Sequence, residues 1–160
     1  MNEKIKKILI KKNKKKIVCL TAYSKSIAKI LDKHVDIILV GDSMASVLYG
    51  QKNTHQISME NIIQHTLSVK KGITKCLLVA DMPKDSYKNR KQAEKNAKLL
   101  LKKTGCDAVK LESNAKNYKI FETLVKKNIP VMGHIGYTPQ FKKKFKIHGQ
   151  TISEITRLLE

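Results

Sequence analysis

Three short apolar runs, each followed by an acidic residue, constrain the fold of this chain more than any other feature. The runs cover residues 37–40, 76–80 and 108–111, and the acids that follow them are Asp42, Asp81 and Glu112. Runs of this length are too short for a helix and are typical of strands buried on both faces, as in a parallel sheet. The carboxylates therefore fall at the carboxyl ends of predicted parallel strands.

Helical periodicity alternates with these strands along the chain. Further strands are predicted at residues 16–22 and 129–133, and amphipathic helices at residues 24–33, 59–71, 89–103, 114–127 and 152–160. This alternation indicates right-handed βαβ units on a parallel sheet. No glycine-rich phosphate-binding motif follows the first strand, whereas polar residues follow several strands in succession, as a barrel active site requires. We therefore predict an α/β fold of the (β/α)8 TIM-barrel type, with about five βα units in this chain.

The domain prediction is a single partial TIM barrel over residues 1–160. It starts with a short amphipathic helix at about residues 4–15, which would cover the bottom of the barrel. Residues 44–57 show no clear period and predict a long loop over the site. Three cysteines without paired spacing (Cys19, Cys76 and Cys106) predict buried thiols in a reducing compartment. No apolar run approaches the ~20 residues of a membrane span, and no signal-peptide core is present, so we expect a soluble, cytoplasmic protein.

The charge of the chain raises the question of nucleic-acid binding. The sequence has 33 basic and 13 acidic residues, a formal net charge of +20. Only Arg90 and Arg157 are arginine, although arginine is the preferred reader of phosphate and guanine. Aromatic residues make up 5% of the chain, so stacking platforms are scarce. The composition therefore favours a lysine-rich solvated surface over a nucleic-acid partner.

The acids at the strand ends predict a metal site. Side chains alternate along a strand, so Asp42 would share a face with Val40 and Ile38, and Glu112 would share one with Lys110. Asp42, Asp81 and Glu112 can then converge at the barrel mouth, where three carboxylates repel one another. Lys110 supplies only one positive charge, and Mg²⁺ prefers a few carboxylates with an oxygen-rich substrate. The alternative is that the acids are solvated strand caps or ordinary ion pairs.

Five sequence motifs in order carry a resemblance to a known family. They are Thr21-Ala22-Tyr23, Val40-Gly41-Asp42-Ser43, Val79-Ala80-Asp81-Met82-Pro83, Val109-Lys110-Leu111-Glu112 and the run VMGHIGYTPQ at residues 131–140. Together they resemble the ketopantoate hydroxymethyltransferase family over about residues 16–151. The last motif alone is specific.

The resemblance implies a Mg²⁺-dependent TIM barrel of the phosphoenolpyruvate-binding superfamily. Such an enzyme transfers a hydroxymethyl group from 5,10-methylenetetrahydrofolate to 3-methyl-2-oxobutanoate, giving 2-dehydropantoate in pantothenate biosynthesis, and the full-length enzyme is a homo-oligomer. Asp42, Asp81 and Glu112 match the family's metal-site acids. The implied substrate-binding residues are Asp42, Ser43, Asp81, Lys110 and His134. The implied 2-oxo acid can chelate Mg²⁺, which agrees with the acid cluster.

The chain also departs from the family's pattern. The loop at residues 50–54 lacks the family's acid, and residues 143–149 differ from its glycine-rich segment, which affects loop closure and folate docking. The general base is expected beyond Glu160, so no catalytic residue is assigned. We expect a fragment, a degraded gene product or one half of a split protein. The alternative functions are another Mg²⁺-dependent carbon–carbon lyase or mutase of the same superfamily, and a non-catalytic remnant or basic RNA-binding protein.

Overall fold

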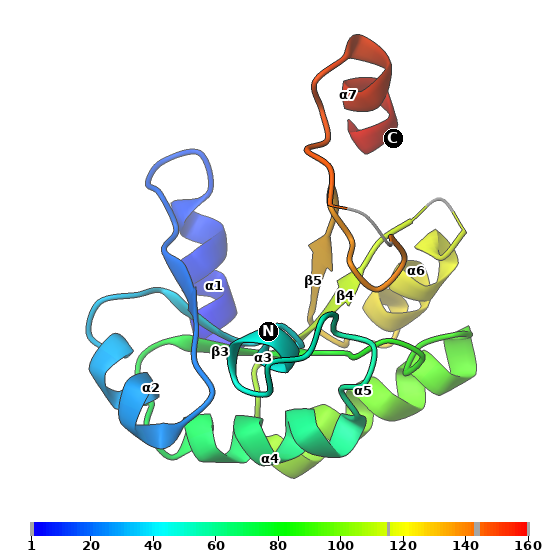
Figure 1. The fold of residues 1–160 in the computed structure, drawn as a ribbon. Helices are drawn as coiled ribbons and strands as arrows, with labels where there is room; N and C mark the ends of the chain where they lie inside the picture. The colour runs from blue at the N-terminus through cyan, green and yellow to red at the C-terminus, as the bar shows by residue number, and fades with distance from the viewer. Residues whose placement is uncertain (1, 115, 143–144, 160) are drawn as a thin grey trace.

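A parallel sheet of five strands forms the centre of the computed structural model, which describes residues 2–114, 116–142 and 145–159 (Figure 1). The strands are β1 (Cys19–Thr21), β2 (Ile37–Val40), β3 (Leu77–Asp81), β4 (Ala108–Glu112) and β5 (Val131–His134). Each strand pairs in parallel with the next one along the chain, so the order in the sheet is the order in the sequence. Consecutive parallel strands joined by helices are the repeating unit of a TIM barrel. The predicted fold class is confirmed.

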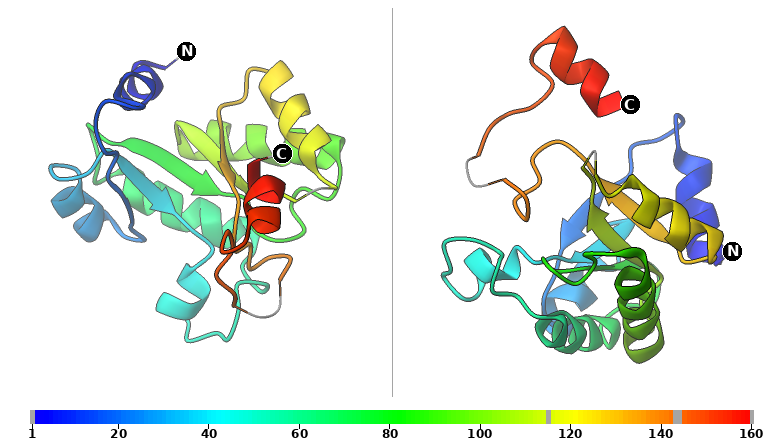
Figure 2. Two further views of the ribbon diagram at one scale, coloured as in Figure 1. Left: turned by 90° about the horizontal axis from the view of Figure 1, so that it is seen from above. Right: turned by 90° about the vertical axis from the view of Figure 1, so that its right-hand side faces the viewer.

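Helices cover the two faces of this sheet unequally. They are α1 (Glu3–Lys11), α2 (Lys25–Leu31), α3 (Met44–Val47), α4 (Met59–Lys70), α5 (Arg90–Thr104), α6 (Tyr118–Lys126) and α7 (Ile152–Leu159). Helices α2, α4 and α5 lie along one face, whereas α1 lies on the other and α7 projects away from the sheet (Figures 1 and 2). Within the described residues, no helix is long and apolar enough to cross a bilayer.

The alternation of side chains divides the core into two clusters. The larger cluster packs Ile38, Leu78 and Leu111 against the helices of the covered face. The smaller cluster contains Ile37, Leu77, Val79 and Ala108, with Ile5 and Ile8 of α1 packed against it. The second face corresponds to the interior of a barrel, and Ile5 and Ile8 of α1 cover part of it.

Several element boundaries differ from the sequence prediction. Helix α1 ends at Lys11 rather than near residue 15, because the chain turns at Asn13, whose φ is 62°. Part of the predicted loop at residues 44–57 forms the short helix α3. Helix α6 begins at Tyr118 rather than near residue 114, because the Asn114 and Asn117 side chains accept backbone N–H groups and form a turn there. Residue 160 lies outside the described residues.

The three cysteines do not share one environment, which corrects the prediction that all are buried. Cys76 and Cys106 are buried, but Cys19 is exposed. Cys19 lies on β1, whose three residues are all exposed because the strand is at one edge of the sheet. An apolar run in the sequence indicates a strand, but it does not show whether other elements cover that strand.

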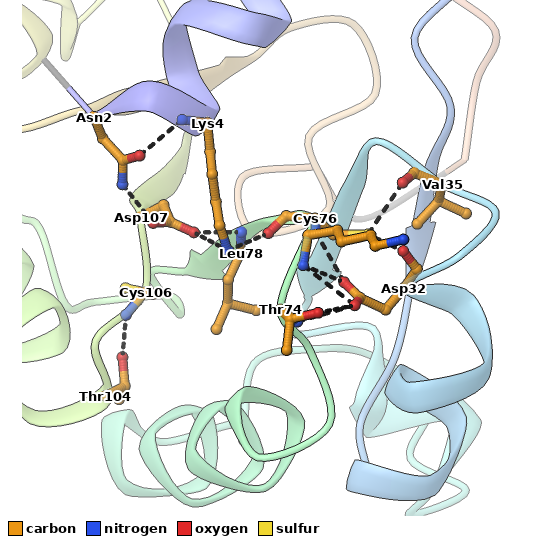
Figure 3. Close-up of polar contacts among 11 residues, drawn as sticks. Asn2, Lys4, Asp32, Val35, Thr74, Cys76, Leu78, Thr104, Cys106 and Asp107 are labelled. Atoms are coloured by element: carbon orange, nitrogen blue, oxygen red, sulfur yellow. Dashed lines mark hydrogen bonds and ion pairs between the residues drawn. The ribbon is translucent and has the colours of Figure 1, made fainter.

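Two aspartates bind the backbone at the amino-terminal ends of the strands (Figure 3). Asp32, at the end of α2, accepts hydrogen bonds from the backbone N–H groups of Thr74, Lys75 and Cys76 at 2.8–3.2 Å. Asp107 accepts one from the Leu78 N–H at 2.9 Å. These carboxylates join the loops before β3 and β4 to neighbouring units.

We expect Asp32→Asn to destabilise the chain by about 1–3 kcal/mol at pH 7, because the charged acceptor of three backbone N–H groups, one of them buried, is lost. Burial acts to raise the pKa of Asp32, but hydrogen bonds from Cys76, Thr74 and Lys75 outweigh it and lower the pKa. The stabilisation is therefore complete above the unfolded pKa of about 3.9 and is lost as the pH falls through the lower folded pKa. Urea unfolding at several pH values measures this difference.

Asp85→Asn is the control for this substitution, because Asp85 lies on the surface and, among the described residues, its carboxylate pairs with Lys88 alone, at 3.3 Å. It should change the free energy of unfolding by less than about 0.5 kcal/mol. Equal effects of the two substitutions at pH 7 would contradict the role assigned to Asp32.

Candidate active site

The register of the sheet brings four of the predicted site residues to one face. Asp81 is paired with Lys110, and Glu112 with His134, so all four lie on the inner face beyond Val79. The Lys110 Nζ donates a hydrogen bond to Asp81 Oδ2 at 2.8 Å. The structure therefore brings Asp81, Lys110 and Glu112 together as predicted, and His134 of β5 lies beside them.

Asp42 reaches this group by a different route from the one predicted. Ile38 and Val40 pack in the cluster under the helices, so strict alternation would turn Asp42 away from the other acids. Strand β2 ends at Val40, however, and the chain leaves the alternation at Gly41. The backbone N–H of Asp42 then donates to Asp81 Oδ2 at 3.3 Å. The prediction that Val40 and Ile38 share the face of Asp42 is wrong, although Asp42 does join the site.

Gly41 has no side chain, so the backbone can change direction where other side chains lie close to it. A Cβ atom at position 41 would lie 3.0 Å from Ser43 Oγ and 3.8 Å from Asp81 Oδ2. The Ser43 hydroxyl lies 2.8 Å from the Tyr23 hydroxyl, and Ser43 is half-buried at the rim of the site. Ser43 therefore has the position that a substrate-binding hydroxyl requires.

Gln140 is the central residue that the sequence interpretation did not assign. Its side chain is 2% exposed, and its Nε2 donates to Asp42 Oδ2 at 2.8 Å and to the Met82 carbonyl at 3.0 Å. Its backbone N–H donates to Glu112 Oε2 at 3.0 Å, and its Oε1 accepts a hydrogen bond from the Tyr87 hydroxyl. The sequence indicated a role for Gln140 only through its place as the last residue of the motif at residues 131–140.

The two aspartates of the site, Asp42 and Asp81, both have raised pKa values. Burial raises the pKa of Asp81 to about 6, although the Lys110 ammonium acts in the opposite direction. Burial also raises the pKa of Asp42, against the Gln140 hydrogen bond and the charge of Lys110. For Lys110, burial favours a lower pKa, but the charges of Asp81, Asp42 and Glu112 outweigh it and the pKa is raised. The site is thus a buried group of three carboxyls around one ammonium.

The predicted metal ligands fit a hard divalent cation in their chemistry. Asp42, Asp81 and Glu112 are 5%, 1% and 1% exposed, and only one buried ammonium lies among them. Asp81 Oδ1 is buried and has no hydrogen-bond partner among the described residues. Carboxylate oxygens of this kind suit Mg²⁺. In the described residues, however, no group of three His, Cys, Asp or Glu side chains is placed so that it could hold a metal ion, and the Gln140 amide is bonded to Asp42.

His134 lies at the edge of this group. Its Nδ1 is 3.6 Å from Glu112 Oε1, which is beyond hydrogen-bond distance, and this nitrogen is buried without a partner in the described part of the chain. His134 therefore lies near the site, but no hydrogen bond from its Nδ1 to the described residues holds the ring in place.

Comparison with known proteins gives the family. The sequence profile of ketopantoate hydroxymethyltransferase matches residues 3–160. The chain belongs to the ketopantoate hydroxymethyltransferase family. It is 50% identical over 154 residues to the 3-methyl-2-oxobutanoate hydroxymethyltransferase of Pelagibacter ubique, covering 96% of this chain and 60% of that protein. The corresponding Anaplasma marginale protein is 43% identical over 156 residues, covering 96% and 56%. The chain thus spans somewhat more than half the length of these relatives.

Solved structures agree with the fold of this family member. Phosphonopyruvate hydrolase, in a complex with oxalate and Mg²⁺, matches with a TM-score of 0.62 at 12% identity, over 83% of this chain and 52% of that one. 2,3-Dimethylmalate lyase, of the PEP mutase/isocitrate lyase superfamily, matches with a TM-score of 0.59 at 10% identity, over 83% and 53%. At these identities the likeness concerns the fold alone.

We expect Gln140→Met to destabilise the chain by about 2–4 kcal/mol, because Asp42, Met82 and Tyr87 each lose a buried hydrogen-bond partner. Urea unfolding measures the change. Gln64→Met is the matched control, because Gln64 bonds only to Glu60 on the exposed face of α4. An effect of Gln140→Met no larger than that of the control would show that the network does not stabilise the fold.

Proposed function

We propose that this chain carries the metal and 2-oxo-acid site of a 3-methyl-2-oxobutanoate hydroxymethyltransferase. The reaction transfers a hydroxymethyl group from 5,10-methylenetetrahydrofolate to 3-methyl-2-oxobutanoate and gives 2-dehydropantoate, a step of pantothenate biosynthesis. Membership of the family and identities of 43–50% to proteins of that name support the reaction. The observation that carries the site is the convergence of three buried carboxyls from successive strands, with Asp81 Oδ1 unpaired in the described chain.

In this proposal Asp42 and Asp81 hold Mg²⁺, and Glu112 completes the acidic group. When bound, the ion would polarise the keto group of the substrate as a Lewis acid. The ammonium of Lys110, which bonds to Asp81, offsets the negative charge of the substrate carboxylate. The Ser43 hydroxyl, which contacts Tyr23, donates to the same carboxylate at the rim of the site.

The remaining residues position these groups. Gln140 holds the Asp42 carboxylate and the loop after β5 in one network, and this loop excludes water from the acids. We assign His134 to the edge of the substrate pocket, on the strength of its unpaired Nδ1. We also infer a cytoplasmic location and a homo-oligomeric full-length enzyme, on the strength of the family resemblance.

Binding of 3-methyl-2-oxobutanoate should depend on Mg²⁺. Asp81→Asn should weaken Mg²⁺ binding at least about tenfold, because a charged ligand with a free oxygen is lost, and this corresponds to about 1.4 kcal/mol. Isothermal titration with Mg²⁺ alone, and then with the 2-oxo acid, measures both affinities. The exposed Asp85→Asn is the charge-matched control, and an equal loss in both variants would argue against an Asp81 metal site.

The chemistry can be followed without the folate co-substrate. In deuterium oxide, the chain with Mg²⁺ should accelerate exchange of the C3 proton of 3-methyl-2-oxobutanoate, because a polarised keto group acidifies that proton. Proton NMR follows the exchange, and Asp42→Asn should return it to the rate with Mg²⁺ alone. If exchange is no faster with the chain than with Mg²⁺ alone, Asp42 and the neighbouring acids do not hold a polarised keto group, and the proposed metal and 2-oxo-acid site is wrong.

A further inference from the structure

A second cavity opens beside the acidic site and is not used by the proposal above. It has a volume of about 510 Å³, within the usual range for ligand sites. Its walls come from two segments far apart in the sequence, residues 43–55 and 137–142, and Ser43 of the acidic site is among the lining residues. The other lining residues are Ser46, Lys52, Asn53, Thr54, His55, Tyr137, Pro139 and Lys142. The cavity and the acidic site therefore share the Ser43 end of β2.

The charged side chains in this lining are lysines, and no acid is among the lining residues that the structure describes. Lys142 Nζ donates to the Gly136 carbonyl at 2.8 Å and lies 2.9 Å from His148 Nε2. An ammonium has three hydrogens, so Lys142 keeps one donor for a ligand. Lys52 is exposed at the mouth of the cavity.

A third ammonium stands directly behind the wall. His55 Nε2 lies 3.1 Å from the Pro139 carbonyl, which can only accept, so this nitrogen carries the proton. Its Nδ1 therefore accepts from the Lys84 ammonium at 3.1 Å. The side chain of Thr54, buried in the same wall, has an Oγ1 with no partner among the described residues. The cavity wall thus carries positive charge, whereas the Thr54 hydroxyl is buried and not open to the cavity.

Apolar surface lies in the same cavity. Tyr137 packs edge-on against Phe145 with ring centroids 5.0 Å apart, which holds the Tyr137 ring at the wall. A ligand that fits here combines an aromatic body with two or more negative charges. Its other end would reach the acidic site past Ser43.

We propose that this cavity binds the p-aminobenzoyl-glutamate part of the folate co-substrate, with Lys52 and Lys142 receiving the glutamate carboxylates. This inference rests on the proposed function, which requires a folate, but it assigns residues of which that function says nothing. The one-carbon end of the co-substrate then faces the 2-oxo acid beside Ser43. The two compartments have opposite charge, so the anionic tail enters only one of them.

Direct binding of two ligands to the full chain tests the proposal. Tetrahydrofolate carries the glutamate, and tetrahydropteroate is the same molecule without it. The chain should bind tetrahydrofolate about tenfold more tightly, and Lys52→Gln and Lys142→Gln should each remove about threefold to fivefold of that preference. Neither substitution should change the affinity for tetrahydropteroate. Lys95→Gln, on the exposed side of α5, removes the same charge and should change neither affinity.

The possible results of this experiment distinguish failure of the folate subsite from failure of the proposed function. Equal affinity for the two ligands, or an equal effect of Lys95→Gln, would overturn the subsite and leave the proposed function intact. Binding of neither ligand, while Mg²⁺ and the 2-oxo acid still bind, would overturn both the subsite and the folate-dependent reaction. Unchanged tetrahydropteroate affinity also shows that the lysine variants are folded. Loss of the glutamate preference in Lys52→Gln and Lys142→Gln alone supports the subsite.

Discussion

The burial of three carboxyl groups at the ends of adjoining strands is the constraint on which the rest of this structure depends. Taking a carboxylate out of water is costly unless it is paired or hydrogen-bonded. Lys110 pairs with Asp81, and Gln140 bonds to both Asp42 and Glu112. Gln140 lies on the loop after β5, so the need to satisfy these acids also determines where that loop runs.

The sequence was sufficient for the sheet and for most of the site, because the physical signals involved are local. Short apolar runs indicate strands, and a period of two places Lys110 and Glu112 on one face. The route of Asp42 could not be predicted this way, since alternation no longer applies once the strand has ended at Val40. The role of Gln140 depends on contacts across 98 residues, which no local pattern encodes. The exposure of Cys19 depends likewise on what covers β1.

Buried polar groups at the two ends of the sheet differ in whether they have hydrogen-bond partners. At the amino-terminal ends, the carboxylates of Asp32 and Asp107 accept hydrogen bonds from backbone N–H groups of neighbouring units. At the carboxyl-terminal ends, buried polar atoms of Asp81, Thr54 and His134 have no partner in the described chain. In barrels, conservation at the first end is usually about stability, and the second end carries the chemistry. The distribution of satisfied and unsatisfied groups in this chain follows the same division.

The residues of β2 and Gly41, which follows them, differ in how well they tolerate substitution. The direction of Asp42 is set by the turn after β2 and not by the pattern of side chains within the strand. Apolar residues of β2 can therefore be exchanged for one another to repack the core without re-aiming the acid. Position 41 has less freedom, because a Cβ there would lie 3.0 Å from Ser43 Oγ and would push this hydroxyl from its place beside Tyr23. A single small residue thus lets the core vary while the chemistry beside it stays fixed.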